Sequence, residues 1–172
     1  GLSRLQPLDC QFRRICTPIP VPITILSGLP SKLRRSRRGS TCVLNVIKDG
    51  ASGTATAVMD DVHSTRNSND GMLFYNNTKG VVTNAVISAN AGTGLGVFPQ
   101  AAGSLTDVTL VSSELSLNAA FGAWIGETGG SSALTINGCT IVNNASGILT
   151  TNSAQVWLAG STISRNYYGI DY

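Results

Sequence analysis

Short runs of alternating apolar and polar residues recur from residue 67 to the end of the chain, and each run leads into the phrase Asn-x-x-Gly-apolar. In some copies one extra residue precedes the glycine. Alternation with a period of two predicts strands, and the asparagines and glycines predict the bends between them. Strands that recur with a period in the twenties predict a solenoid, in which each coil covers the next. The repeated asparagines are Asn67, Asn90, Asn118, Asn144 and Asn166, at spacings of 23, 28, 26 and 22 residues.

The two most similar copies predict what one coil contains. Residues 133–148 and 155–170 align without a gap at a constant offset of 22. Each has a strand with period-two alternation, a bend of small or polar residues, a shorter strand, the Asn corner, and a third strand that opens at the glycine. Three short strands per turn predict an all-β parallel β-helix of about five coils over residues 41–172. We expect residues 1–40 to form a separate, irregular segment.

Inward positions of successive coils should stack in columns along the axis of such a helix. Most positions in the predicted columns are Leu, Ile or Val, as expected for strands buried between coils. The first strand predicts Val82, Leu110, Ile136 and Leu158, and the second strand predicts Ile87, Leu115, Ile141 and Ile163. The third strand predicts Met72, Leu95, Ala123, Ile148 and Ile170, followed by Phe74, Val97, Ile125, Thr150 and Tyr172.

The repeated asparagine has a structural explanation. Identical side-chain amides that stack along an axis can donate and accept hydrogen bonds as a ladder, and each can also bridge the backbone of its turn. The glycine that follows permits a positive φ at the corner. We therefore interpret Asn67, Asn90, Asn118, Asn144 and Asn166 as an asparagine ladder, with no catalytic role.

The repeats also carry a resemblance. Residues 140–148, Thr-Ile-Val-Asn-Asn-Ala-Ser-Gly-Ile, and residues 162–170, Thr-Ile-Ser-Arg-Asn-Tyr-Tyr-Gly-Ile, resemble the repeats of bacterial right-handed parallel β-helix proteins of the pectate-lyase-like superfamily. The resemblance covers about residues 43–172 and implies a right-handed, single-stranded helix in a secreted or cell-surface protein. That superfamily includes polysaccharide lyases and hydrolases, epimerases, tailspikes and adhesins. The resemblance therefore implies a fold and leaves the activity open.

Charge separates the two ends of the chain. Residues 1–40 hold eight Lys and Arg against one Asp, a net charge of +7, and five of the six prolines. Residues 41–172 hold four Lys and Arg against eight acids, a net charge of −4. We therefore expect no nucleic acid on the β-helix itself. Pro20 and Pro22 interrupt the early apolar stretch, so we expect no membrane span, and the stretch is a poor signal peptide.

Both ends of the chain leave alternatives open. The basic segment is a disordered tail, an anion-binding tail, a cap over the first coil, or a truncated or frame-shifted reading. At the other end, Tyr172 falls inside a predicted third strand. A coil that stops there exposes a strand edge, which indicates either a fragment of a longer β-helix, incomplete at the C-terminus, or end-to-end self-association.

The four cysteines do not predict a metal site. Cys10, Cys16, Cys42 and Cys139 show no paired CxxC spacing and no accompanying histidines. A disulfide between Cys10 and Cys16 stays open. Cys139 shares its repeat position with Ala85, Ser113 and Ser161, which predicts a small-residue slot inside the coil.

Candidate catalytic residues are few. Asp60 and Asp61 are the only adjacent acids, and Arg66 follows in the same coil. Neighbouring residues of a strand point to opposite faces, whereas glycoside hydrolysis needs facing carboxylates, and a calcium-dependent lyase needs an acidic cluster. His63 is the only histidine and has no partner nucleophile. The sequence leans against an enzyme and predicts no metal and no cofactor.

Aromatic residues carry the one binding signal. Trp157 and Trp124 each lie between inward residues, so alternation turns both indoles outward, on different faces of the coil. Exposed aromatic rings can stack on sugar rings. Tyr167 and Tyr168 are weaker corner candidates.

These observations favour a non-catalytic β-helix scaffold of a secreted or surface protein that contacts polysaccharide. The first alternative is a fragment of a β-helical polysaccharide lyase or glycoside hydrolase. The second is an oligomeric segment of an adhesin or tailspike.

Overall fold

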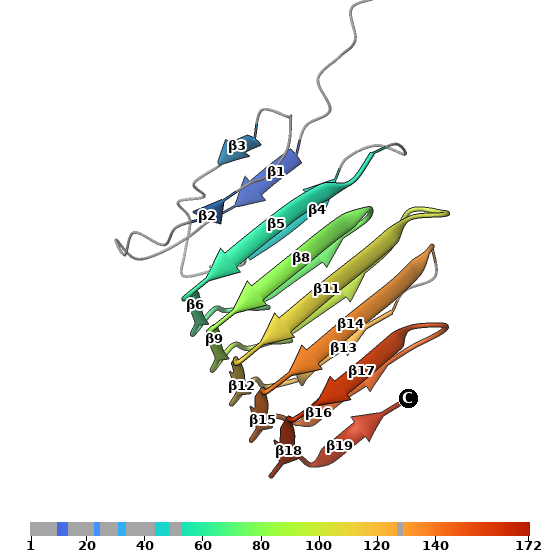
Figure 1. The fold of residues 1–172 in the computed structure, drawn as a ribbon. Coiled ribbons are helices and arrows are strands. Elements are labelled where there is room, and N and C mark those ends of the chain that lie inside the picture. Colours follow the sequence, from blue (N-terminus) through green and yellow to red (C-terminus); the bar gives the residue numbers. More distant parts are fainter. Residues whose placement is uncertain (1–9, 14–22, 25–30, 34–43, 49–52, 127–128) are drawn as a thin grey trace, which may run out of the picture.

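The computed structural model describes residues 10–13, 23–24, 31–33, 44–48, 53–126 and 129–172, with side chains from residue 53 onward. The strands of these residues form three sheets that run along one axis (Figure 1). Sheet A contains, in spatial order, β19 (Tyr168–Asp171), β16 (Ser146–Thr150), β13 (Phe121–Ile125), β10 (Leu95–Phe98), β7 (Met72–Tyr75), β4 (Leu44–Lys48), β1 (Cys10–Arg13) and β3 (Ser31–Leu33). Sheet B contains β17 (Gln155–Ala159), β14 (Ser131–Asn137), β11 (Leu105–Val111), β8 (Thr78–Thr83), β5 (Ala55–Asp60) and β2 (Ile23–Thr24). Sheet C contains β18 (Thr162–Ser164), β15 (Thr140–Val142), β12 (Glu114–Ser116), β9 (Val86–Ser88) and β6 (His63–Thr65).

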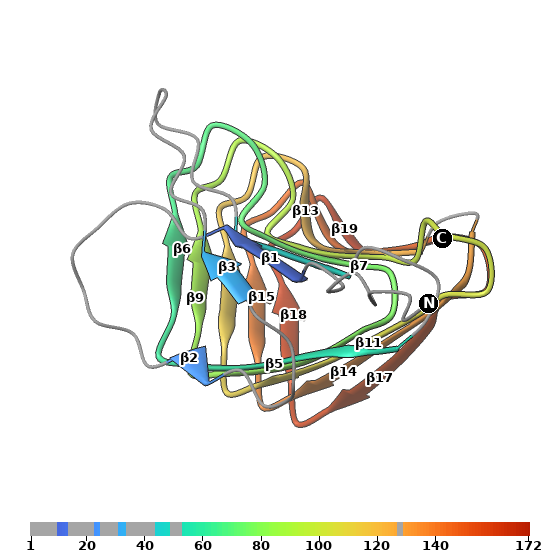
Figure 2. The ribbon, with the colours of Figure 1, turned by 90° about the horizontal axis from the view of Figure 1, so that it is seen from above.

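From β5 onward each coil contributes one strand to each sheet, which makes five coils. Equivalent strands of successive coils pair in parallel, as β5 does with β8 and β6 with β9. Seen from the N-terminal end, the chain passes from β5 through β6 to β7 clockwise as it recedes (Figure 2). A clockwise path that recedes is right-handed. The predicted all-β parallel β-helix of about five coils is therefore confirmed.

The strand register reproduces the predicted columns. Val82, Leu110, Ile136 and Leu158 are cross-strand partners, and Ile87, Leu115, Ile141 and Ile163 are partners in sheet C. The central members of each column are completely buried. Burying one Leu or Ile side chain contributes about 1.5–3 kcal/mol, so these columns are the main apolar stabilisation of the coils. Tyr172 departs from the prediction, because it lies beyond β19 and is fully exposed.

The predicted asparagine ladder is present and runs through all five coils. Asn67 Nδ2 donates to Asn90 Oδ1 at 2.7 Å, and the next three steps repeat this bond at 2.8, 3.0 and 3.1 Å. The same Oδ1 atoms also accept the backbone N–H of the preceding asparagine, as Asn118 Oδ1 does from Asn90 at 3.2 Å. The other hydrogen of the amide goes to a backbone carbonyl of the preceding coil, as from Asn118 to Ile87 at 3.2 Å. Each internal amide is therefore fully used.

The ladder has a direction. Every asparagine donates toward the C-terminal coil and accepts from the N-terminal side. At the N-terminal end, Asn67 Oδ1 is buried and accepts no hydrogen bond from the described residues. At the C-terminal end, Asn166 Nδ2 donates to the carbonyl of Ile141 at 3.0 Å. Acceptors thus face one end of the solenoid and donors face the other.

The glycine that follows each asparagine corrects one prediction. Gly71, Gly94 and Gly122 do not have the positive φ that we expected. They are required for space instead, because a Cβ on each would lie 2.6 Å from the carbonyl oxygen of the equivalent glycine in the next coil. The same Cβ would also approach the ladder, for example at 2.8 Å from Asn90 Nδ2 at Gly71.

The positive φ values lie at two other corner positions. One column immediately precedes the asparagine, and the other lies between the first and second strands of each coil. Leu117, with a φ of 57° and an exposed side chain, shows that the corner imposes this conformation even where the residue does not favour it. The first column contains Arg66, Ala89, Leu117, Asn143 and Arg165, and the second contains Asp61, Asn84, Ser112, Gly138 and Gly160.

The small-residue slot is also confirmed. Cys139 is a free, buried cysteine in a column with buried Ala85 and Ser113. Burial raises the pKa of the Cys139 thiol, so it stays neutral near pH 7 and acts as a packing residue. Of the other cysteines, Cys10 is described only in its backbone, and Cys16 and Cys42 lie outside the described residues. Their disulfide state stays a prediction.

The N-terminal segment is described only in part. β1 pairs antiparallel with β4, and β2 pairs antiparallel with β5, so the direction of pairing changes where the coils begin. Most of residues 1–40 lie outside the described residues. The predicted boundary at residue 40 therefore stays a prediction.

We expect Asn118→Ala to lower the free energy of unfolding by about 1–3 kcal/mol, because it leaves buried donors of Asn90 without an acceptor. Asn137→Ala removes an exposed asparagine from a strand and serves as the matched control, with little expected effect. Urea unfolding measures both. Equal losses for the two variants would contradict the ladder's role.

We expect Gly122→Ala to destabilise the chain by about 1–3 kcal/mol, because its Cβ would overlap the backbone of the next coil. Gly169→Ala is the matched control, since a Cβ there meets nothing within 4 Å. Thermal unfolding of both variants checks the difference. A Gly122→Ala protein as stable as the control would refute the spatial explanation of this glycine column.

Candidate functional site

The outer face of sheet B carries the most exposed tryptophan of the described residues. This face looks toward the viewer in Figure 1. Its central column runs through cross-strand partners, with Trp157 on the last strand and small or β-branched side chains on the others. Trp157 is 51% exposed, so a face of its indole is open to solvent. The members of the column are Val58, Val81, Thr109, Thr135 and Trp157.

Polar side chains flank Trp157 on the same face. Gln155 lies two residues before it on β17, and Asn137 lies on β14 as the partner of Ala159. Both are exposed, and Thr135, the direct partner of Trp157, is partly exposed. An open indole next to amides and a hydroxyl offers one apolar surface together with donors and acceptors. Sugars present these two kinds of surface as well.

Trp124 points outward on sheet A, opposite in the fold to Trp157, as alternation predicts. Its surroundings differ, because its ring packs edge-on against Phe98 at a centroid distance of 5.0 Å and against Phe121 at 5.5 Å. Phe98 in turn contacts Tyr75 at 5.7 Å. Trp124 is partly buried, and its Nε1 is buried without a hydrogen-bond partner among the described residues. Its ring is therefore part of an aromatic cluster that links three coils.

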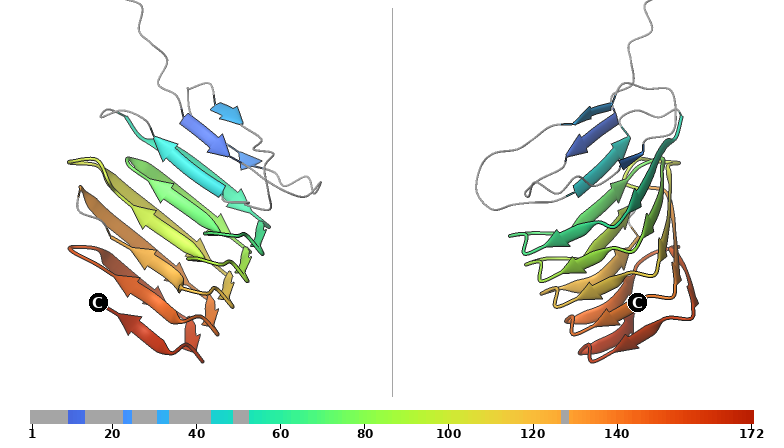
Figure 3. Two further views of the ribbon diagram at one scale, coloured as in Figure 1. Left: turned by 180° about the vertical axis from the view of Figure 1, so that it is seen from behind. Right: turned by 60° about the vertical axis from the view of Figure 1, so that its left-hand side comes forward.

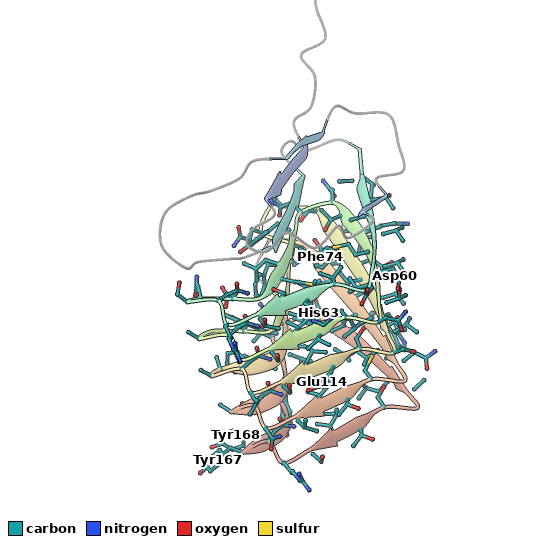
Figure 4. All side chains as sticks on the ribbon, turned by 90° about the vertical axis from the view of Figure 1, so that its left-hand side faces the viewer. Asp60, His63, Phe74, Glu114, Tyr167 and Tyr168 are labelled. Atoms are coloured by element: carbon teal, nitrogen blue, oxygen red, sulfur yellow. The ribbon has the colours of Figure 1, made fainter. Side chains whose placement is uncertain are left out.

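Tyr167 and Tyr168 lie at the Asn corner of the last coil and project away from it (Figure 4). They are 82% and 53% exposed, and their rings meet edge to face at 4.6 Å. Phe74, by contrast, lies in the interior in the same view and is completely buried. The tyrosine pair is separated from Trp157, since it lies next to sheet A while Trp157 lies on sheet B.

The catalytic candidates do not form a site together. Asp60 ends β5 with an exposed side chain, and Asp61 occupies the turn with a φ of 53°. Asp61 approaches His63 at 3.8 Å, with both side chains exposed. Arg66 lies at the next corner, beyond β6, with a φ of 56°. Among the described residues the only ion pair is the contact between Asp61 and His63.

Asp60 has its own polar surroundings. Its carboxylate accepts hydrogen bonds from the Thr83 hydroxyl and from Asn84 Nδ2, the latter at 2.8 Å. These bonds, first that of Thr83 and then that of Asn84, lower the pKa of Asp60. A carboxyl group with a lowered pKa stays ionised and is unsuited to act as a general acid. The interaction explains Asp60 as part of a surface network between two coils.

The other acids of the described coils are dispersed. Asp107 lies two strands from Asp60 and four residues along the sheet, a separation of roughly 16 Å at about 4.8 Å per strand and 3.3 Å per residue. Paired glycosidase carboxylates lie within about 5–9.5 Å of each other. No group of three His, Cys, Asp or Glu residues in the described coils could hold a metal ion.

Comparisons with protein-family models, with curated proteins and with solved structures find no match to this chain. The parallel β-solenoid therefore stands on its own geometry, and membership of the pectate-lyase-like superfamily stays a prediction. The structure has no helix among the described residues, hence none long and apolar enough to cross a membrane.

We expect Thr83→Val to raise the pKa of Asp60 toward its ordinary value, because the substitution removes the hydroxyl that stabilises the carboxylate most. A lowered pKa contributes stability above the unfolded-state pKa, and this stability is lost as pH falls through the folded-state pKa. The variant should therefore lose less stability than the wild type on acidification. Titration of the Asp60 carboxyl by NMR checks the shift, and an unchanged pKa would contradict the assigned cause.

Proposed function

We propose that this chain is a non-catalytic β-solenoid scaffold of a secreted or surface protein, and that it contacts polysaccharide through the outer face of sheet B around Trp157. The observation that carries the proposal is the open indole of Trp157, next to Gln155 and Asn137. A sugar ring can stack on the indole while its hydroxyls exchange hydrogen bonds with the two amides. Rigid strands hold all three side chains, so little order is lost on binding.

The regular face also suits an extended ligand. Outward positions of successive strands lie about 4.8 Å apart along the solenoid axis. A polysaccharide that runs along this axis from Trp157 would next meet Thr135 and Thr109, whose hydroxyls are available on partly exposed side chains. The proposed ligand class is therefore a neutral or weakly charged polysaccharide, bound in an extended conformation.

The dispersed acids support the non-catalytic part of the proposal over the enzyme alternative. Asp60 is held as an ionised group by Thr83 and Asn84, and Asp107 is too distant to act with it. The adhesin or tailspike alternative requires association between chains, a separate property from sugar contact.

We expect Trp157→Ala to weaken binding to a responsive polysaccharide about tenfold, equivalent to about 1.4 kcal/mol, because stacking on the indole is lost. Affinity electrophoresis against a panel of neutral and acidic polysaccharides measures the effect. Leu117→Ala is the matched control, because it removes another exposed apolar side chain from a different corner.

Two outcomes would contradict this proposal. Wild-type binding that Trp157→Ala leaves unchanged would place the contact elsewhere, for example at Tyr167 and Tyr168. Depolymerisation of any polysaccharide, assayed with and without Ca²⁺, would show that the chain is catalytic and would direct attention to Asp60, Asp61 and Arg66.

A further inference from the structure

The C-terminal coil presents a face built like the contact between two coils. β17, β18 and β19 each form the last strand of their sheet, and all three lie at the same end (Figure 3). Leu158 and Ile170 are partners of the completely buried Ile136 and Ile148, yet they are 42% and 54% exposed. Unpaired strand edges and inward apolar side chains therefore meet on one surface.

The ladder also ends in donors on this face. In each earlier coil the asparagine backbone N–H and one Nδ2 hydrogen go to the Oδ1 of the next asparagine. In the described residues the backbone N–H of Asn166 meets no acceptor, and its Nδ2 donates only to Ile141. The face is therefore complementary to a group that supplies a side-chain oxygen at the ladder position.

Gly169 adds an independent observation. A Cβ at this position would meet nothing within 4 Å, and the residue does not have a positive φ. Neither space nor backbone conformation within this chain requires a glycine there. In the preceding coils the equivalent glycine leaves room for the carbonyl oxygen of the next glycine. Gly169 thus leaves open the space that another Asn-x-x-Gly coil would use.

We propose that the C-terminal coil is a docking site for a further parallel coil with an Asn-x-x-Gly corner, presented by a separate β-solenoid chain. The direction of the ladder selects this partner. A second copy that docked tail to tail would bring two sets of donors together at Asn166. A second copy that docked head to tail would meet β5 and β4 already paired with β2 and β1. The docking does not depend on the proposed sugar contact.

The fit of the face is tested with a chain that carries a second copy of residues 151–172 joined after Tyr172. Asp171 is the partner of Leu149, so this junction reproduces the way residue 151 follows residue 150. We expect the amides of β17, β18 and β19 to exchange about tenfold more slowly with solvent in the joined chain. Gly169→Ala should abolish that protection while leaving the unjoined chain's stability unchanged. Unaltered exchange in the joined chain would overturn the proposal.

The source of the partner is tested with a synthetic peptide of residues 151–172, added in millimolar excess to the unjoined chain. We expect the same amides to be protected, and the Asn166→Leu peptide, which lacks the acceptor oxygen, to protect them much less. Protection in the joined chain alone would contradict docking by a separate chain. A dimer of the unjoined chain in sedimentation, dissociated by Gly169→Ala, would make a second copy the occupant and would also contradict the proposal.

Discussion

The structure depends on one repeated hydrogen bond, donated by the amide of one asparagine to the side-chain oxygen of the next. The bond recurs at 2.7–3.1 Å from Asn67 to Asn166, close to the spacing of the strands themselves. Because each amide also takes a backbone carbonyl and a backbone N–H, it satisfies polar groups that the corner would otherwise bury without partners. The apolar columns supply the larger stabilisation, but the ladder fixes the position of each coil on its neighbour. A coil shifted by one residue would lose both.

The interior of the solenoid could be predicted from the sequence because it repeats. Alternation at Ile136 and Ile141, with the same types one period away, identifies inward columns, and a buried column tolerates few residue types. The glycine of the corner was identified, but for the wrong reason. Its function depends on the carbonyl of the next coil, a contact between residues more than twenty positions apart that no local propensity reveals.

The outer surface was harder to predict, since solvent imposes few constraints on it. Alternation correctly turned Trp124 and Trp157 outward, yet it could not distinguish an open indole from one packed among Phe98 and Phe121. That difference depends on which residues of neighbouring coils meet across the sheet. Gln155 and Asn137 were missed for the same reason, because their proximity to Trp157 follows from strand register. The aromatic signal itself was in the sequence, and the spacing of 22 between the last two coils would have placed Asn137 beside it.

The central claim is that a regular, rigid interior presents a polysaccharide-contact surface at Trp157. The most direct test is NMR mapping of backbone and side-chain signals while a bound polysaccharide is titrated. The account predicts changes confined to the outer face of β14 and β17, with the indole of Trp157 and the amides of Gln155 and Asn137 shifting most and the ladder amides unmoved. Changes centred on the Tyr167 corner or on Asp60, with Trp157 unaffected, would contradict it.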